Sequence, residues 1–162
     1  MFLLRRPASQ QITCFLDASR ALPLSYQPEG LVRAGAGGFR VDEQIVPVGS
    51  GAAAFARAVT ALMEWHFELG WVQLCRVLDS TGEGGGPTFG FAYGTLTNHA
   101  ESGEELFEIS FDRHSGEVSY RIRAVSRPRA TLARLAAPYT RLLQARFRRE
   151  SAHAVRRAID AR

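Results

Sequence analysis

The sequence contains no lysine, so all twenty of its basic side chains are arginines. Without a lysine ammonium, the chain cannot form a Schiff base with a carbonyl compound, and it cannot supply the lysine of a phosphate-binding P-loop. Codon bias is the simpler explanation of this absence, and selection for the forked guanidinium of arginine is the other. The missing lysine therefore excludes two kinds of chemistry without identifying a third.

Cysteines and long apolar runs are also scarce. Cys14 and Cys75 lie far apart and outside any C-x-x-C motif, which argues against a zinc site or a redox pair and suits a reducing compartment. The first seven residues carry their charges after their apolar residues, the reverse of a secretory signal. No stretch approaches the roughly 20 apolar residues of a membrane-spanning helix. We therefore expect a cytoplasmic protein without a transmembrane segment.

Motifs for metals, phosphates and nucleophiles are missing too. The four histidines are His66, His99, His114 and His153. None of them has a second histidine or a carboxylate at the i+4 position, and no H-E-x-x-H occurs. The glycine clusters at residues 35–38 and 82–86 match no phosphate-binding or dinucleotide-binding pattern, and no G-x-S-x-G is present. We expect neither a bound metal nor a cofactor.

Charge is distributed unevenly along the chain. Residues 1–126 hold ten arginines and fourteen acidic residues, whereas residues 127–162 hold ten arginines and two acidic residues. The basic C-terminal segment has three interpretations: a solvated helix face, a surface that contacts nucleic acid, or a surface that contacts an anionic membrane. Nucleic-acid modules interleave aromatic with basic residues, whereas Tyr139 and Phe147 belong to the apolar stripe. We therefore do not expect nucleic acid as a partner.

The hydrophobic patterns predict an α+β fold in a single domain, residues 1–162. Helical periodicity marks a short helix after Ser9 and longer helices at residues 51–69 and 131–159. Alternation marks strands at residues 39–48, 71–78, 89–96, 105–112 and 118–125. Short connections between most of the strands predict an antiparallel meander whose helices cover one face. The expected architecture is a curved antiparallel sheet packed on a long C-terminal helix.

Two of these elements have strongly sided patterns. In the strand at residues 89–96, Phe91 and Tyr93 share a face with Phe89. The other face carries the small residues Gly90, Ala92 and Gly94, so another segment can approach it closely. The C-terminal helix has Leu135, Tyr139, Leu143 and Phe147 at successive steps of four. Pro138 lies inside that stripe and removes a backbone donor, which predicts a kink or a break.

The connection after residue 96 is the best candidate for chemistry. It holds His99 together with Glu101, Glu104 and Glu105. An imidazole and carboxylates could do acid–base work if they faced a cavity, with Arg127 steadying an anion or an enolate. A polar hairpin loop explains the same residues equally simply. His99, Glu104 and Arg127 are therefore candidate catalytic groups, and the chain is not assigned as an enzyme.

At Phe89–Leu96 the chain resembles a domain-of-unknown-function family of bacteria and plants. Further stretches that fit this family are Arg5–Pro7, Leu24–Tyr26, Gly38–Asp42, Gly51–Arg57, Trp65, Gly70–Trp71, His99, Gly103–Phe107, Ser126–Pro128, Leu132–Leu135, Pro138, Arg141–Gln144 and Arg146–Phe147. The family is distantly similar to the helix-grip superfamily of lipid-transfer domains and polyketide cyclases. That resemblance implies a START-like architecture, in which a sheet wraps a C-terminal helix around an apolar cavity, and it implies no particular reaction.

One departure from the family concerns the middle of the chain. Residues 71–74 run directly into Cys75, where family members carry some further residues and a tryptophan-containing strand. The resemblance therefore implies that one or two central strands are missing. An exposed sheet edge left by this loss would favour a homodimer.

These observations lead to a main hypothesis and two alternatives. The main one is a binding module for a small apolar ligand, with Tyr93 and the candidate catalytic groups as polar contacts. Its expected walls are Phe91, Phe107, Tyr120, Tyr139, Leu143 and Phe147. The same aromatic residues could instead fill a solid core. The alternatives are an enzyme that uses this cavity with His99 and Glu104, and an interaction protein that uses the arginine-rich helix.

Overall fold

The structure, a computed structural model, describes residues 10, 13–14, 17–18, 21–34, 37–64, 75–81, 87–97, 99, 101–129 and 137–161, with the backbone alone described for 75–81 and 137–141. Its elements are α2 (Leu31–Ala34), β1 (Arg40–Ser50), α3 (Ala52–Met63), β2 (Cys75–Thr81), β3 (Thr88–Thr95), β4 (Glu101–Phe111), β5 (Glu117–Pro128) and α5 (Ala137–Asp160). The predicted helix after Ser9 lies largely outside the described part. Residues 65–74, which hold the predicted end of the second helix and the predicted start of the next strand, lie outside it as well.

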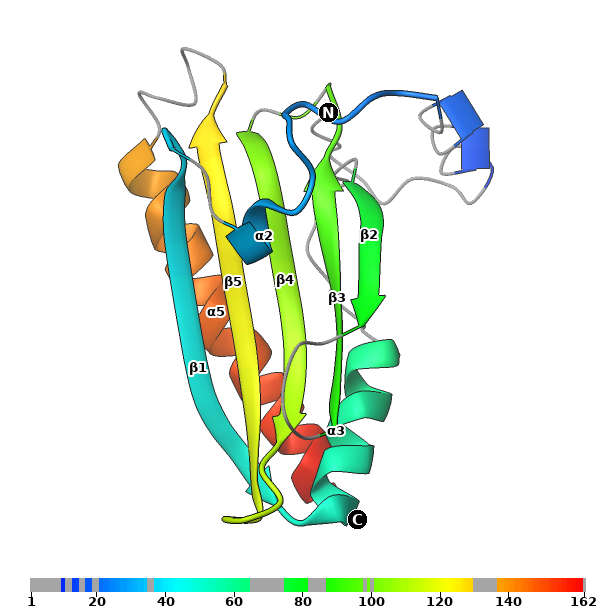
Figure 1. Cartoon of the computed structure of the whole chain (residues 1–162), viewed down its shortest axis with the longest axis vertical. Helices are drawn as coiled ribbons and strands as arrows, with labels where there is room; N and C mark the ends of the chain where they lie inside the picture. Colours follow the sequence, from blue (N-terminus) through cyan, green and yellow to red (C-terminus); the bar gives the residue numbers. More distant parts are fainter. Residues whose placement is uncertain are drawn as a thin grey trace.

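The described strands form one five-stranded sheet in the order β1-β5-β4-β3-β2, and every neighbouring pair is antiparallel. Strands β2 to β5 are the predicted meander. Strand β1, the first in the chain, joins the sheet beside β5 rather than beside β2. The α+β architecture predicted from the sequence is confirmed: a curved antiparallel sheet with the C-terminal helix lying diagonally across it (Figure 1).

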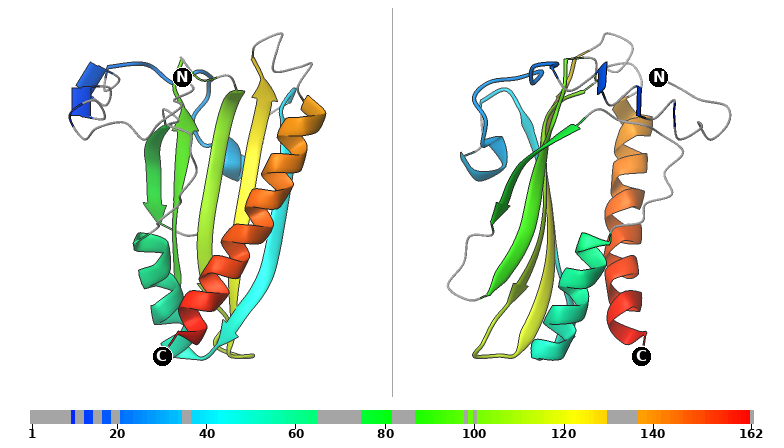
Figure 2. Two further views of the ribbon diagram at one scale, coloured as in Figure 1. Left: turned by 180° about the vertical axis from the view of Figure 1, so that it is seen from behind. Right: turned by 90° about the vertical axis from the view of Figure 1, so that its right-hand side faces the viewer.

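The sheet has two different faces, which Figure 2 shows edge-on. Helices α3 and α5 lie on the face that we call the inner face, and α2 lies on the other, which we call the outer face. Register and alternation together assign side chains to each face. Phe107 pairs with Ile122, and Ile109 pairs with Tyr120, as inner-face neighbours on β4 and β5.

The inner face holds the main core. It lies between α3, the C-terminal half of α5 and the end of the sheet at which a turn joins β4 to β5 (Figure 1). Its buried residues are Val48, Ala54, Ala58, Leu62, Phe107, Ile109, Val118, Tyr120, Ile122, Ala152, Val155 and Ile159. Close packing is clear at Gly49, where an added Cβ would lie 3.1 Å from Ala54 Cβ and 3.3 Å from Ile159 Cγ2. This end of the layer is a filled core.

The outer face carries a second, smaller core made by the segment that precedes β1. Tyr26, Leu31 and Val32 pack over Ala92 and Val125. The glycine face of β3 receives this segment: a Cβ at Gly94 would lie 2.0 Å from Tyr26 Oη. The close approach predicted for the bare side of β3 is therefore made by the chain's own residues.

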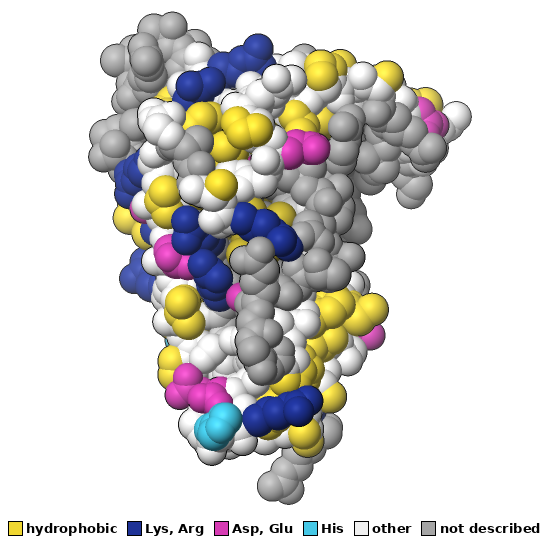
Figure 3. All heavy atoms as spheres, viewed as in Figure 1, with side chains coloured by type: hydrophobic (Ala, Val, Ile, Leu, Met, Phe, Trp, Pro, Cys, Tyr) yellow, Lys and Arg dark blue, Asp and Glu magenta, His cyan; other side chains and the backbone are white. Residues whose placement is uncertain are grey.

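The rest of the outer face is charged and open. Arg121 Nε lies 2.6 Å from Glu43 Oε1 and Arg121 Nη1 lies 3.7 Å from Glu108 Oε1, so β1, β5 and β4 are linked by a row of ion pairs. Basic and acidic side chains are mixed over this face (Figure 3). Ile45 of the edge strand β1 is 59% exposed there. The homodimer through an exposed sheet edge stays a prediction.

Helix α5 is described from Ala137, so Pro138 is its second described residue. Residues 131–136, on the N-terminal side of Pro138, lie outside the described part, so the predicted kink or break at Pro138 stays a prediction. The described residues 137–160 form one continuous helix. Two arginines fix the C-terminal half: Arg156 Nη2 donates to Pro47 O at 2.6 Å, and Arg57 Nε donates to Ile159 O at 2.8 Å.

Candidate functional site

Along the inner face from the filled core toward the start of β4, large apolar residues give way to small and polar ones. The cross-strand row Asp42, Ala124, Glu105 and Tyr93 runs from β1 to β3. The next row toward the core contains Ile122, Phe107 and Phe91 in its corresponding strands. A carboxyl group thus lies directly beside an aromatic row, which sets up the polar and apolar parts of one site.

Phe107 is at the centre of the aromatic cluster. Its ring centroid lies 5.5 Å from that of Phe91 and 5.6 Å from that of Tyr93, both in stacked geometry. Helix α5 contributes Phe147, whose ring meets Phe107 edge-on at 6.3 Å. These spacings are typical of favourable aromatic pairs. The sequence-predicted residues Phe91, Tyr93, Phe107 and Phe147 therefore come together between the sheet and α5.

The burial of these rings changes along the layer. Phe107 is only 1% exposed and Tyr120 is fully buried, as expected of core residues. Phe91, Tyr93 and Phe147 face the same layer and are only partly buried. The partly exposed parts of these rings leave some apolar surface on this side of the layer.

Glu105 is the residue of this site that was not singled out from the sequence as a candidate catalytic group. Its carboxylate accepts a hydrogen bond from the Tyr93 hydroxyl. Burial raises the pKa of Glu105 to about 7, while the Tyr93 hydrogen bond and the Arg148 guanidinium oppose that rise and Glu101 adds to it. A carboxyl group with this pKa exists in both protonation states near neutral pH, so it can give or take a proton.

Glu101 lies on the same face of β4 as Glu105, and the row that contains Gly103 lies between them. Burial and the Asp42 carboxylate raise the pKa of Glu101. Gln144 of α5 reaches it, with Nε2 at 3.2 Å and 3.4 Å from the two carboxylate oxygens. Asp42 forms an ion pair with Arg40, whose Nη2 lies 2.7 Å from Asp42 Oδ1. The polar end of the layer therefore holds three acids, Asp42, Glu101 and Glu105. Among the described residues, Asp42 is the one of these three that has an oppositely charged partner within hydrogen-bond distance on a strand.

Tyr120 closes the site on the side of the filled core. Its hydroxyl is buried beside Ser151, although no hydrogen bond of good geometry joins the two. Burial raises the pKa of Tyr120, Ser151 partly opposes that rise, and the Glu105 charge adds to it. The Ser151 hydroxyl itself donates to Arg148 O at 3.0 Å. Tyr120 therefore belongs to the buried boundary between the aromatic cluster and the filled core.

His99 lies in the connection between β3 and β4 and is partly buried. Its Nδ1 accepts a hydrogen bond from the backbone N–H of Glu101 at 3.0 Å. Burial lowers its pKa, and a backbone hydrogen bond to Glu101 partly opposes that change. His99 is thus held next to Glu101 as part of the connection, and burial favours the neutral form of its imidazole.

The structure separates the other two candidate catalytic residues from this site. Glu104 and Arg127 lie on the outer face, because alternation turns them away from Phe107. Glu104 Oε1 and Oε2 accept hydrogen bonds from Gly30 N at 2.7 Å and Val32 N at 3.0 Å. The grouping of His99, Glu104 and Arg127 around one apolar space is therefore wrong.

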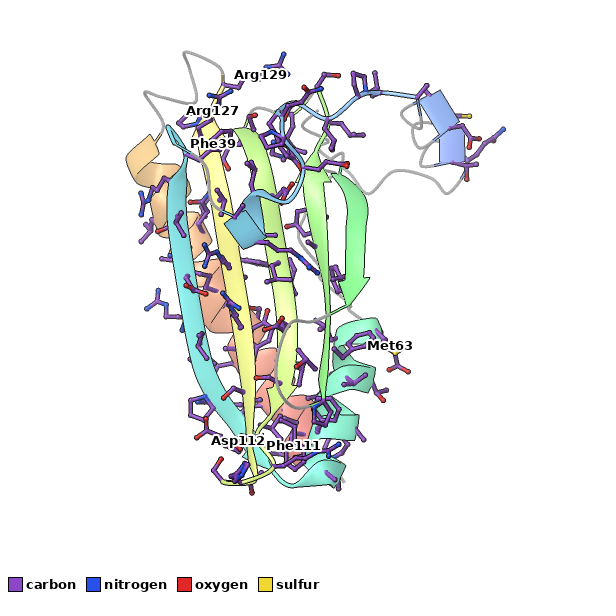
Figure 4. The ribbon with its side chains drawn as sticks, in the orientation of Figure 1. Phe39, Met63, Phe111, Asp112, Arg127 and Arg129 are labelled. Carbon is purple, nitrogen blue, oxygen red and sulfur yellow. The ribbon has the colours of Figure 1, made fainter. Side chains whose placement is uncertain are left out.

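Arg127 instead stacks on an aromatic ring near the end of the sheet. Its Cζ lies 4.5 Å from the ring centroid of Phe39. Figure 4 shows the two side chains together on the outer face, far along the sheet from Phe111. Of the other predicted wall residues, Leu143 is partly buried and the side chain of Tyr139 lies outside the described part. Among the described residues, no group of three or more potential metal ligands could hold an ion.

Comparison with known proteins places the chain in a family. The fold and the site define an α+β protein with a carboxyl-bearing row beside an aromatic cluster. The sequence model of the family described as Domain of unknown function (DUF1990) matches residues 68–154, more than half of the chain. The protein belongs to this family.

Two relatives support the assignment. A UPF0548 protein of Arabidopsis thaliana is 32% identical over 155 positions that cover 76% of this chain and 75% of the relative. A UPF0548 protein of Dictyostelium discoideum is 27% identical over 209 positions that cover 99% of this chain and 97% of the relative. That alignment is longer than the 162 residues of this chain, so the relative carries residues without a counterpart here.

One solved structure was also found to be similar. A hypothetical protein of Helicobacter pylori aligns over 66% of this chain and 80% of that protein, with 7% sequence identity and a TM-score of 0.36. A likeness this low carries no argument about function. In the described part of the chain, no helix has both the length and the apolar character required to cross a bilayer.

Proposed function

We propose that the protein is a binding module for a small, mostly apolar ligand held between the sheet and the N-terminal half of α5. The observation that carries this proposal is the uneven burial of one aromatic cluster. Phe107 is 1% exposed, whereas Phe91, Tyr93 and Phe147, which pack against it, remain partly exposed. Ligand sites combine such apolar walls with a few placed polar groups, and Glu105 and Tyr93 are groups of that kind.

The fold supports the proposal as well. One long helix crosses the inner face of a curved antiparallel sheet whose first and last strands are neighbours. This is the arrangement that the resemblance to the helix-grip superfamily implies, and we carry that relationship forward as part of the proposal. The arginine-rich helix gives less support to an interaction protein, because Arg156 binds Pro47 and Arg146 pairs with Glu150 within the chain.

Native mass spectrometry of the freshly purified full chain tests the proposal. We expect a co-purified small molecule that dissociates on denaturation and can then be identified. Phe147→Ala should reduce its occupancy, because this variant removes a wall from α5. Met63→Ala is the matched control: Met63 is 69% exposed at the end of α3 and points away from the inner face (Figure 4).

A ligand-free protein that also binds none of the apolar probes described below would overturn the binding proposal. Equal occupancy in Phe147→Ala and in the control would place any bound molecule elsewhere.

A second candidate function is acid–base catalysis in the same site, and Glu105 is the observation that favours it. A half-buried carboxyl group with a pKa of about 7 beside a phenol is a suitable general base or acid. Incubating the protein with its co-purified compound, or with close analogues, should then give a product detectable by mass spectrometry. Glu105→Gln should bind the compound and stop its conversion, and a variant that still converts it would remove this candidate.

A further inference from the structure

The charge at the polar end of the inner face limits which ligands can bind there. Glu101 and Glu105 both lie on this face, and burial raises the pKa of each. Asp42 is already paired with Arg40. From α5, Gln144 donates hydrogen bonds to Glu101 and the Arg148 charge acts on Glu105. Among the described side chains of this end, the three acids Asp42, Glu101 and Glu105 outnumber the arginines Arg40 and Arg148, although the chain as a whole is basic.

An anionic head group would be poorly accommodated in this environment. A ligand carboxylate or phosphate beside Glu105 would place like charges close together where water is largely excluded, which disfavours ionisation of both groups. Glu105 has one hydrogen-bond donor, Tyr93, and can accept more hydrogen bonds. A hydroxyl or a protonated amine can donate such a bond, and an amine also offsets the charge.

Resting on the proposed function, we infer that the ligand is an apolar molecule with one hydrogen-bond-donating group, a hydroxyl or a protonated amine, which binds to Glu105. The apolar part then lies along Phe91, Phe107 and Phe147, and the donating group lies in the row of Glu105 and Tyr93. This assignment excludes free fatty acids and other apolar anions as preferred ligands. The inferred ligand differs from an apolar anion in the charge and hydrogen-bonding character of its polar group, and probes that differ only in this group can test the inference.

Three probes with one shared ring system make this test: 2-naphthylmethylamine, 2-naphthalenemethanol and 2-naphthoate. Isothermal titration calorimetry with the full chain at pH 8 should show the amine and the alcohol binding about tenfold or more tighter than the carboxylate. Glu105→Gln should remove the preference for the amine and bring the carboxylate to within about threefold of it. Glu117→Gln, an exposed change of equal charge at the far end of β5, should leave all three affinities unaltered.

The outcomes separate the two proposals. If the carboxylate binds as tightly as the amine, or if Glu105→Gln leaves the order of the probes unchanged, the inference about the donating group is overturned while the binding module remains. If none of the three probes binds and no compound co-purifies, the proposed function itself fails.

Discussion

Glu104 and Glu105 are adjacent in β4 and point to opposite faces of the sheet. Because they are the same residue type at the same place along the strand, the differences between them reflect the two faces of the sheet. Glu104 is 3% exposed and accepts two backbone hydrogen bonds from the segment at α2. Glu105 is held by the Tyr93 hydroxyl beside an aromatic cluster, and its pKa rises to about 7. Two backbone donors satisfy the outer carboxylate, whereas burial disfavours the charged form of the inner one.

This contrast separates a structural acid from a functional candidate. Two donors at fixed backbone positions satisfy Glu104, so it connects α2 to the sheet and leaves little for a ligand to gain. Glu105 lacks such backbone donors among the described residues and lies where apolar surface is still partly open. Buried groups with perturbed pKa values are enriched at functional sites. Each prediction below tests whether the two faces really have these different roles.

The largest effect is expected on the outer face. Glu104→Ala removes the acceptor of the Gly30 and Val32 N–H groups and leaves both donors without this partner. Charge-assisted hydrogen bonds contribute about 1.5–3 kcal/mol each, so we expect the free energy of unfolding to fall by about 3 kcal/mol at pH 7. Urea denaturation followed by circular dichroism measures this change.

Glu104→Gln keeps one accepting oxygen and should lose about half as much. A loss below about 0.5 kcal/mol for Glu104→Ala would contradict the structural role of this residue.

Glu105→Gln should have the opposite sign and should depend on pH. The folded-state pKa of Glu105, about 7, lies above its ordinary value of 4.5. Its contribution to stability is therefore fully present below about pH 4.5 and is lost as pH rises to about 7. The whole shift corresponds to about 3 kcal/mol, and partial solvent access reduces it, so Glu105→Gln should be about 1–3 kcal/mol more stable than the parent chain at pH 8.

Denaturation curves between pH 4 and pH 8 show whether the difference appears in that window. At pH 4 the variant and the parent chain should have nearly equal stabilities. If Glu105→Gln is destabilised equally at both pH values, Glu105 has the same role as Glu104 and the comparison between the two faces fails.

The sequence predicted the faces of the strands well, because alternation of side chains is local. Phe107 and Tyr120, which the sequence predicted as walls of one layer, do lie on one face, and the period of two places Ile109 and Ile122 beside them. The position of β1 beside β5 could not be predicted, since a connection that contains a helix can lead to either edge of a sheet. Helix α2 was also missed, because four residues carry little periodicity and Glu104 supplies part of its stability through tertiary contacts.

The candidate site was predicted in part for the same reason. Phe91, Tyr93, Phe107 and Phe147 were named from their stripes, and the structure brings them together. Glu105 shares its parity with Phe107, so the alternation could have identified it in place of Glu104. Its pairing with Tyr93 could not, because it depends on the register between β3 and β4. His99 and Arg127 were chosen by residue type, which says nothing about the face on which a side chain lies.

The smallest effect is expected for Arg127, which tests the outer face from its far end. The Arg127 guanidinium lies over the Phe39 ring at 4.5 Å, and an exposed cation–π contact of this kind contributes about 0.5–1 kcal/mol. Arg127→Ala should lower the free energy of unfolding by about that amount. A double-mutant cycle with Phe39→Ala should recover most of the loss as coupling between the two residues.

The same variant also distinguishes a structural role from a binding role. Because Arg127 and the aromatic cluster lie on opposite faces of a continuous sheet, Arg127→Ala should leave the affinity for the naphthalene probes unchanged, whereas Phe147→Ala should reduce it. Both variants can be compared by calorimetry under one set of conditions. If Arg127→Ala weakened probe binding about tenfold, the ligand would have to contact the outer face. The division between a structural face and a binding face would then be wrong.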